Sequence, residues 1–207
     1  LLVDVSGSRN FGTLSQTKRD MMAEVAATLA FSTIANNDKV GVILFSDKIE
    51  KFIPAKKGKT HVLHIIRELL SFEPTSTGTD IAQALQYFSN AQKRHCTAFL
   101  ISDFICAEAM YKPLLIASNR HEVNAIQIYD RHETDLPNIG LIKFHDAETG
   151  NDLWIDTAIA SVRSAYAQSW RNNQNELEQL FTRTGVAHVS VRTDEDYVKA
   201  LMHLFRC

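Results

Sequence analysis

The chain has 207 residues, of which 45% are hydrophobic and 22% charged, with 8 glycines and 4 prolines. This composition excludes collagen-like, low-complexity and disordered classes, and the length is ample for a sizeable core. The formal net charge of -2, from 22 basic and 24 acidic residues, provides no global attraction to nucleic acid or to an anionic membrane. No apolar run approaches the roughly 20 residues that cross a bilayer. We therefore expect a soluble globular protein with no nucleic-acid partner and no membrane segment in this chain.

The chain begins at Leu1 within an apolar stretch and has no initiator methionine. We expect residues 1–207 to form a single domain, and an N-terminal part of the full-length protein to be absent. The three cysteines are too few and too scattered for a disulfide framework. They favour a reducing compartment, and we predict the cytoplasm.

Apolar runs of strand length alternate with helical patterns along the chain. Several runs are continuous in Val, Ile and Phe, as in strands that helices cover on both faces. The predicted strands are residues 1–5, 39–45, 48–53, 97–102, 124–129 and 187–191. Apolar residues at helical spacing predict helices around residues 22–33, 62–69, 81–88, 159–181 and 197–204.

This alternation implies right-handed βαβ units, so the predicted fold class is α/β. We expect a doubly wound, Rossmann-like, mostly parallel sheet with helices on both faces. Residues 48–53 follow the preceding strand after almost no gap, which forces an antiparallel pair, and their lysines fit an exposed edge strand. Residues 141–145 and 152–155 flank a loop that contains glycine, and they predict a β-hairpin inserted near 140–157.

Acidic and hydroxyl side chains follow two of the predicted parallel strands. Asp4, Ser6 and Ser8 come at the end of the first strand, and Asp103 follows the strand over 97–102. Thr79 lies in a short polar loop that enters a helix. In an open α/β sheet, ligands bind outside the carboxyl ends of the strands, where the strand order reverses. We therefore expect these side chains to meet in one crevice.

Oxygen ligands of this kind suit a hard cation, and two carboxylates with waters are usual for Mg²⁺. The sequence predicts a Mg²⁺ site, with Mn²⁺ or Ca²⁺ as the alternatives. If hydroxyls bind the ion directly and the acids bind through water, the ion keeps an open position. Such an ion favours a carboxylate from another protein as its last ligand.

Each hydroxyl residue has a simpler interpretation when it is taken alone. Ser6, Ser8 and Thr79 also fit turn or N-cap positions, which Ser and Thr favour. Capping does not require acids at two separate strand ends, so the full set favours the metal site. Asp80 stays open between an N-cap and a partner of the site.

The same residues resemble the metal-ion-dependent adhesion site of von Willebrand factor A domains. The matching positions are Asp4-x-Ser6-x-Ser8, Thr79 in Gly-Thr-Asp, and Asp103 in Ser-Asp. In that family the two serines and the threonine coordinate the metal, while the acids act largely through water. The resemblance implies these roles here, and it covers most of the chain.

More narrowly, the chain resembles bacterial von Willebrand A proteins found alongside MoxR-type AAA+ ATPases. The supporting phrases include Asn-Asp-Lys-Val-Gly-Val-Ile-Leu-Phe and Arg-Thr-Asp-Glu-Asp-Tyr-Val-Lys-Ala-Leu. This resemblance implies a non-enzymatic interaction module that grips an acidic residue of a partner. The implied partner is a MoxR-type ATPase, or a client protein that such a pair remodels or helps to assemble.

An alternative function is a Mg²⁺-dependent phosphatase with Asp4 as the nucleophile. Haloacid-dehalogenase-like enzymes also place an acid at the end of the first strand, but they carry Asp-x-Asp, whose second acid serves as the general acid. Position 6 is Ser6, which suits that role poorly. The sequence therefore favours binding over catalysis.

Overall fold

The computed structural model describes residues 1–6, 17–76, 78–105, 108–145 and 152–205. The elements in chain order are β1 (Leu2–Asp4), α1 (Lys18–Ala35), β2 (Val40–Phe45), β3 (Ile49–Lys56), α2 (Lys59–Ser71), α3 (Ile81–Ala91), β4 (Thr97–Ser102), η2 (Glu108–Met110), α4 (Tyr111–Ser118), β5 (Glu122–Tyr129), α5 (Arg131–Thr134), β6 (Leu141–His145), β7 (Asp152–Asp156), α6 (Ala160–Thr184), β8 (Ala187–Arg192) and α7 (Tyr197–Leu204).

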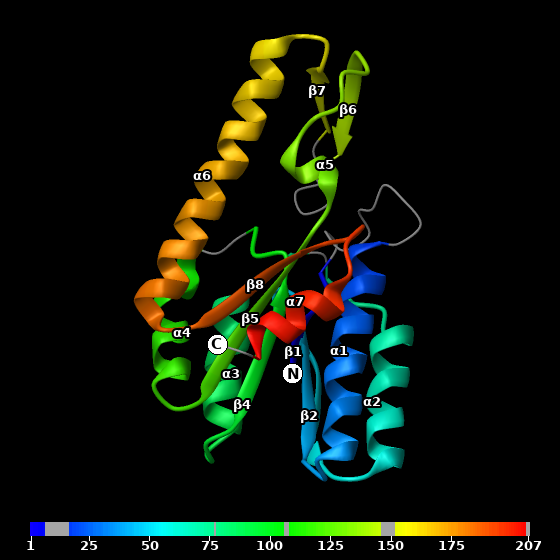
Figure 1. The fold of residues 1–207 in the computed structure, drawn as a ribbon, viewed down its shortest axis with the longest axis vertical. Helices are drawn as coiled ribbons and strands as arrows, with labels where there is room; N and C mark the ends of the chain where they lie inside the picture. Colours follow the sequence, from blue (N-terminus) through cyan, green and yellow to red (C-terminus); the bar gives the residue numbers. More distant parts are fainter. Residues whose placement is uncertain (7–16, 77, 106–107, 146–151, 206–207) are drawn as a thin grey trace.

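Six strands form one sheet in the order β3-β2-β1-β4-β5-β8 (Figure 1). β1 runs parallel to both β2 and β4, and β5 runs parallel to β4 and β8. The chain goes outward from β1 to β2 and β3 and then returns to β4 on the other side of β1. The strand order therefore reverses between β1 and β4, which confirms the predicted α/β fold class and its switch point.

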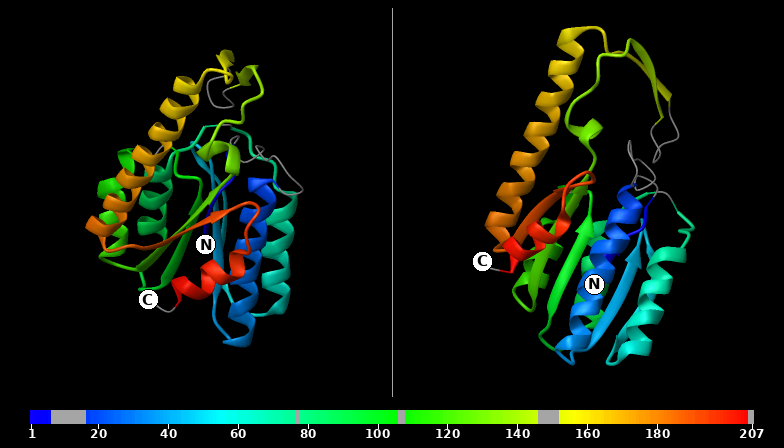
Figure 2. Two further views of the ribbon diagram at one scale, coloured as in Figure 1. Left: turned by 45° about the horizontal axis from the view of Figure 1, so that its top comes forward. Right: turned by 45° about the vertical axis from the view of Figure 1, so that its right-hand side comes forward.

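Helices cover both faces of this sheet (Figure 2). Neighbouring strand residues point to opposite faces, so Val3 and Leu2, each 2% exposed, pack into different cores. One core joins the sheet to α1, α2 and α7, and the other joins it to α3, α4 and α6. The central strands β1, β2, β4 and β5 are thus largely buried on both faces, as the continuous apolar runs predicted.

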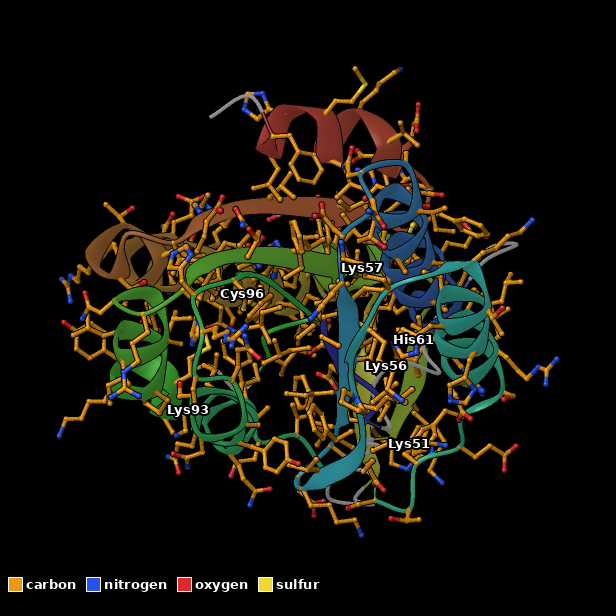
Figure 3. All side chains as sticks on the ribbon, turned by 90° about the horizontal axis from the view of Figure 1, so that it is seen from below. Lys51, Lys56, Lys57, His61, Lys93 and Cys96 are labelled. Atoms are coloured by element: carbon orange, nitrogen blue, oxygen red, sulfur yellow. The ribbon has the colours of Figure 1, made fainter. Side chains whose placement is uncertain are left out.

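The edge strand β3 is antiparallel to β2, as predicted. Its lysines, together with Lys57, lie along the outer border of the sheet (Figure 3). Lys51 pairs with Glu68 of α2 at 2.6 Å. The strand runs to Lys56, past the predicted end at residue 53, and so includes Pro54. An edge strand has one unpaired side, which is why it tolerates proline.

The segment after α5 forms the predicted hairpin. β6 and β7 pair in antiparallel fashion from Leu141↔Asp156 to His145↔Asp152 and make a two-stranded sheet separate from the main one. The hairpin stands beyond the carboxyl ends of the main strands, beside the beginning of α6 (Figure 1). Leu153 and Trp154 are exposed there.

The helix α6 is 25 residues long and ends at Gly185, whose φ of 67° is the left-handed conformation that glycine adopts without strain. Within the described ranges, none of the helices combines the length and the apolar character needed to cross a bilayer.

Candidate metal centre

Asp4 is the last residue of the central strand β1, between Phe45 of β2 and the end of β4. Its side chain is 3% exposed. One carboxylate oxygen, Oδ1, accepts the Ser6 N–H at 2.9 Å, and Oδ2 accepts the Ser102 hydroxyl at 2.7 Å. These bonds hold the carboxylate in one orientation at the carboxyl end of the sheet.

Asp103 follows β4, the strand next to β1, and is also 3% exposed. Its Oδ1 accepts the Ile105 N–H at 3.3 Å, and the Gln127 amide of β5 donates to its backbone carbonyl at 3.3 Å. The parallel register of β1 and β4 therefore brings the two predicted acids to the same edge of the sheet.

The two carboxylates affect each other electrostatically. Burial, and after it the negative charge of Asp103, raise the pKa of Asp4 from 3.8 to about 6. The hydrogen bonds from Ser102 and Ser6 oppose this shift. A proton or a cation at this position would therefore be held favourably.

The loop before α3 places Thr79 at the same edge of the sheet. Its neighbour Asp80 donates its N–H to the carbonyl of Ser46, directly after β2, at 2.8 Å. Asp80 Oδ1 accepts the Gln83 N–H at 2.8 Å and caps α3, which settles its role as an N-cap. Thr79 is half-buried on this anchored loop.

The two serines of the motif differ in what the structure describes. Ser6 is fully buried and its backbone N–H contacts Asp4, whereas Ser8 lies outside the described residues. The structure thus brings Asp4, Ser6 and Asp103 together. It places the loop that carries Thr79 beside Ser46, at the carboxyl end of the neighbouring strand β2.

Two further charged residues that the sequence analysis missed, Lys18 and Glu133, adjoin Asp103. The Nζ of Lys18, the first residue of α1, donates to Asp103 Oδ2 at 2.8 Å and to Glu133 Oε1 at 2.6 Å. The Lys18 side chain is 1% exposed and that of Glu133 is 14% exposed. Glu133 Oε2 also accepts the Asp130 N–H at 2.9 Å, within a capping box at the end of β5.

The ionisation of this pair follows from its surroundings. Burial disfavours the charged ammonium of Lys18, but Asp103 and Glu133 outweigh it and raise its pKa, so Lys18 stays charged. Burial raises the pKa of Glu133, and Lys18 opposes that change. Asp4, Lys18, Asp103 and Glu133 are called the strand-end cluster below.

A signal for Lys18 is present in the sequence. The apolar stripe of α1 runs through Met22, Val25 and Leu29, and one more helical turn toward its beginning reaches Lys18. A lysine on the buried stripe of a helix needs a buried acid as its partner. Glu133 had no comparable signal, because its position depends on the short helix α5.

The donor set of the strand-end cluster fits a hard cation. Its oxygen atoms belong to carboxylates, and Ser6 and Thr79 at the same edge of the sheet carry hydroxyls; oxygens of both kinds are ligands that Mg²⁺ prefers. Three carboxylates against one ammonium leave excess negative charge in a buried place. Within the part of the chain that the structure describes, no three His, Cys, Asp or Glu side chains could hold a metal by themselves. Hydroxyls such as those of Ser6 and Thr79 would therefore have to contribute.

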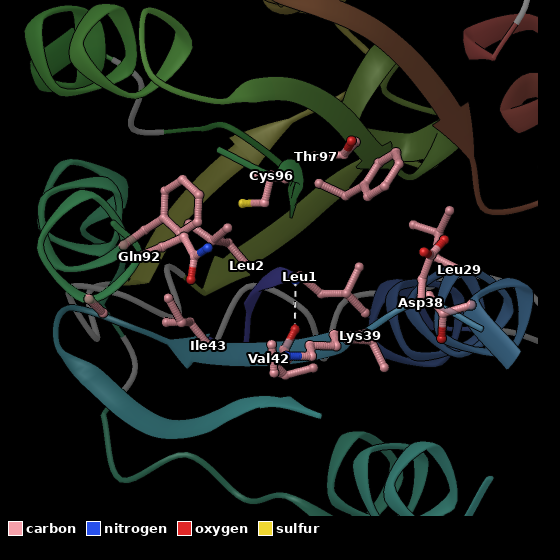
Figure 4. Close-up of a pocket in the computed structure, with 18 of the residues that line it drawn as sticks. Leu1, Leu2, Leu29, Asp38, Lys39, Val42, Ile43, Gln92, Cys96 and Thr97 are labelled. Carbon is pink, nitrogen blue, oxygen red and sulfur yellow. Dashed lines mark hydrogen bonds between the residues drawn. The ribbon is translucent and has the colours of Figure 1, made fainter. Parts of the chain in front are cut away.

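Two cavities lie at opposite ends of the sheet. A cavity of about 190 Å³ adjoins the strand-end cluster and is lined by Asp103, Glu133 and Trp170, among others. A larger one of about 460 Å³ lies at the amino ends of the strands, around Leu1 and Cys96 (Figure 4). Ligands of open α/β sheets bind at the carboxyl ends, so the smaller cavity is the one next to the expected site.

The sequence matches a protein family to which no activity is assigned. The profile of the family described as "Protein of unknown function DUF58" matches residues 1–176. The uncharacterized protein Rv1480 of Mycobacterium tuberculosis is 28% identical over 202 residues, which cover 96% of this chain and 63% of that protein. The chain therefore spans less than two thirds of the length of this relative.

Solved structures resemble the fold. The conserved hypothetical protein BatB from Bacteroides thetaiotaomicron aligns over 100% of this chain and 97% of its own, with a TM-score of 0.63 and 15% identity. The SpRpn10 VWA domain aligns over 99% of this chain and 90% of its own, with a TM-score of 0.49 and 12% identity. The likeness to BatB supports the α/β architecture alone.

Proposed function

Since the chain belongs to the DUF58 family, whose function is unknown, we propose from its site that it is a metal-dependent protein–protein interaction module. The observation that carries the proposal is the pair of buried carboxylates, Asp4 and Asp103, at the ends of adjacent central strands. They lie where the strand order reverses, which is the ligand position of this fold class.

In this proposal Mg²⁺ is the ion, with Mn²⁺ or Ca²⁺ as substitutes. The hydroxyls of Ser6, Ser8 and Thr79 would bind it directly, and Asp4 and Asp103 would bind through water. When bound, the ion supplies a positive position that attracts a carboxylate of a partner protein. The chain's own part is to orient the acids: the Ser102 hydroxyl and the Ser6 N–H fix Asp4, and Lys18 fixes Asp103.

We propose a binding rather than a catalytic role. A phosphatase that used Asp4 as its nucleophile would need a second acid two residues later to protonate the leaving group. Ser6 occupies that position and is fully buried.

The first experiment measures thermal unfolding against Mg²⁺ concentration for the wild type and for Asp4→Asn. A ligand that binds only the folded state adds about 2.7 kcal/mol at 100 times its dissociation constant. We expect this stabilisation in the wild type and its loss in Asp4→Asn. The control is Asp38→Asn, because Asp38 is an exposed acid before β2, at the opposite end of the sheet, and it should respond as the wild type does.

Thr79→Ala tests the hydroxyl ligands, with Thr75→Ala as a control in the same loop. Thr75 donates to Glu50 at 2.8 Å and has no role in the proposed site. The metal proposal is wrong if Mg²⁺ stabilises all these variants equally, or if it stabilises none of them, including the wild type.

For the partner, we propose a MoxR-type AAA+ ATPase or a client protein that it remodels, acting in the cytoplasm. The test mixes the protein with a purified MoxR-type ATPase from the same organism, in Mg²⁺ or in EDTA, and measures complex formation by analytical ultracentrifugation. The proposal predicts a complex in Mg²⁺ that EDTA and Asp4→Asn both dissolve. A complex that forms equally in EDTA would contradict capture through the metal.

A further inference from the structure

We infer that Lys18 is a built-in positive charge of the metal site, which positions Asp103 and lowers the affinity of the site for divalent cations. The inference rests on the proposed function and adds how the affinity of that site is set. Lys18 belongs to α1, a helix that contributes no residue to the predicted metal motif.

The geometry joins three separate elements. Lys18 begins α1, Asp103 follows β4, and Glu133 belongs to α5 after β5. One ammonium contacts both carboxylates, at 2.8 and 2.6 Å. The ammonium therefore donates a hydrogen bond to Asp103 Oδ2, while Asp103 Oδ1 accepts the Ile105 N–H. Each carboxylate oxygen of Asp103 already has a donor before any metal arrives.

A cation at this place affects a metal in two ways. It repels a divalent ion nearby, and it withdraws part of the negative charge of Asp103 that would otherwise attract the ion. Glu133 acts in the opposite direction, because its carboxylate neutralises Lys18 from the other side. The charge of residue 18 should therefore weaken metal binding, and the charge of residue 133 should strengthen it.

A purely structural ion pair is the competing explanation. It would hold α1 against β4 and α5, and substitution would change the free energy of unfolding but not the metal affinity. Buried ion pairs are often no more stabilising than apolar side chains of similar size, so stability alone does not explain a lysine here. The metal affinity is the property that separates the two explanations.

The test titrates the intact chain with Mn²⁺ and follows free Mn²⁺ by electron paramagnetic resonance. The variants are Lys18→Gln, Lys18→Arg and Glu133→Gln. We expect Lys18→Gln to tighten Mn²⁺ binding by at least about tenfold, Lys18→Arg to bind as the wild type does, and Glu133→Gln to bind more weakly. The matched control is Lys51→Gln, whose lysine pairs with Glu68 on the exposed edge strand and should leave the affinity unchanged.

The outcomes separate this inference from the proposed function. If Lys18→Gln binds Mn²⁺ no more tightly than the wild type, and Asp4→Asn abolishes binding in both backgrounds, the inference is wrong and the metal site stands. If neither the wild type nor Lys18→Gln binds Mn²⁺, the proposed function fails and the inference fails with it. Circular dichroism checks folding. If Lys18→Gln does not fold, the Mn²⁺ affinity of Glu133→Gln is the deciding result. Weaker binding than in the wild type supports the inference, and unchanged or tighter binding overturns it.

Discussion

The strand-end cluster and the lysine edge, which consists of Lys51, Lys56 and Lys57, carry charge in opposite surroundings. The side chain of Lys18 is 1% exposed and bridges two acids, whereas that of Lys51 is 39% exposed and contacts one. Lys56 and Lys57 are exposed (Figure 3). A charge that water solvates costs little at the surface, but a charge inside the protein needs a partner.

This difference in burial distinguishes charges that protect a sheet edge from charges that lie at a ligand-binding position. Charged lysines along an edge strand such as β3 are typical of edges that are protected from edge-to-edge association. Acids at the ends of β1 and β4 lie where a ligand of this fold class binds. The number of charges in a segment therefore says less about function than their burial and their position on the sheet.

The largest expected effect is on stability, when the buried lysine of the strand-end cluster and the exposed lysine of the edge are each replaced by methionine. Lys18→Met leaves Asp103 and Glu133 buried without their cation, so it should lower the free energy of unfolding by about 3–5 kcal/mol. Lys51→Met removes a half-exposed pair and should cost less than about 1 kcal/mol. Urea unfolding measures both variants. Equal losses would contradict the distinction between the two regions.

A second prediction concerns pH in the absence of metal. The pKa of Asp4 is about 6 in the folded protein, against an ordinary value of 3.8. Between these values the folded state binds more protons than the unfolded state, so stability falls as the pH rises from about 4 to about 6, by at most roughly 3 kcal/mol. Asp4→Asn should lack this fall. Urea unfolding in EDTA, measured from about pH 4 to about pH 6, gives the stability of both proteins. If stability changes with pH in the same way in the wild type and in Asp4→Asn, the raised pKa does not belong to Asp4.

A smaller effect is expected at the beginning of α1. Thr17 caps this helix, and its hydroxyl and N–H also pair with Asp20 in a capping box. Thr17→Ala should cost about 1 kcal/mol and loosen the turn that carries Lys18. Glu24→Gln, at an exposed position of the same helix, is the control. Chemical denaturation gives both values, and a loss no larger than that of the control would argue against the cap.

The smallest effect is expected at the lysine edge. The double substitution of Lys56→Gln and Lys57→Gln should change stability by less than about 0.5 kcal/mol, because both side chains are exposed. It should speed aggregation, which light scattering follows at a fixed protein concentration, because the edge loses its charge. Unchanged aggregation would mean that these lysines do not protect the edge.

Much of the fold was predictable because its signals are local. The strand at residues 97–102 and the hairpin near 140–157 were found as predicted, since each is an apolar run bounded by polar or turn residues. The end of β3 was placed three residues too early. Pro54 normally ends a strand, and only the edge position of β3 allows the strand to continue.

The site was predictable in part, for a physical reason. Acids at strand ends are visible in the sequence, and the parallel register of β1 and β4 carries Asp4 and Asp103 to one edge. The contacts of Lys18 with residues 85 and 115 positions away depend on the packing of α1 and α5 against the sheet. The buried stripe of α1 marks Lys18 as a lysine that needs an acidic partner, but no spacing in the sequence encodes the packing that selects Asp103 and Glu133.

The most direct test of a metal at the strand ends is a crystal of the protein grown in Mn²⁺, with anomalous diffraction data collected near the manganese absorption edge. We predict one strong anomalous peak beside Asp4, with the hydroxyls of Ser6 and Thr79 among the ligands of the ion. A peak only at another place, or no peak at a saturating Mn²⁺ concentration, would contradict this prediction.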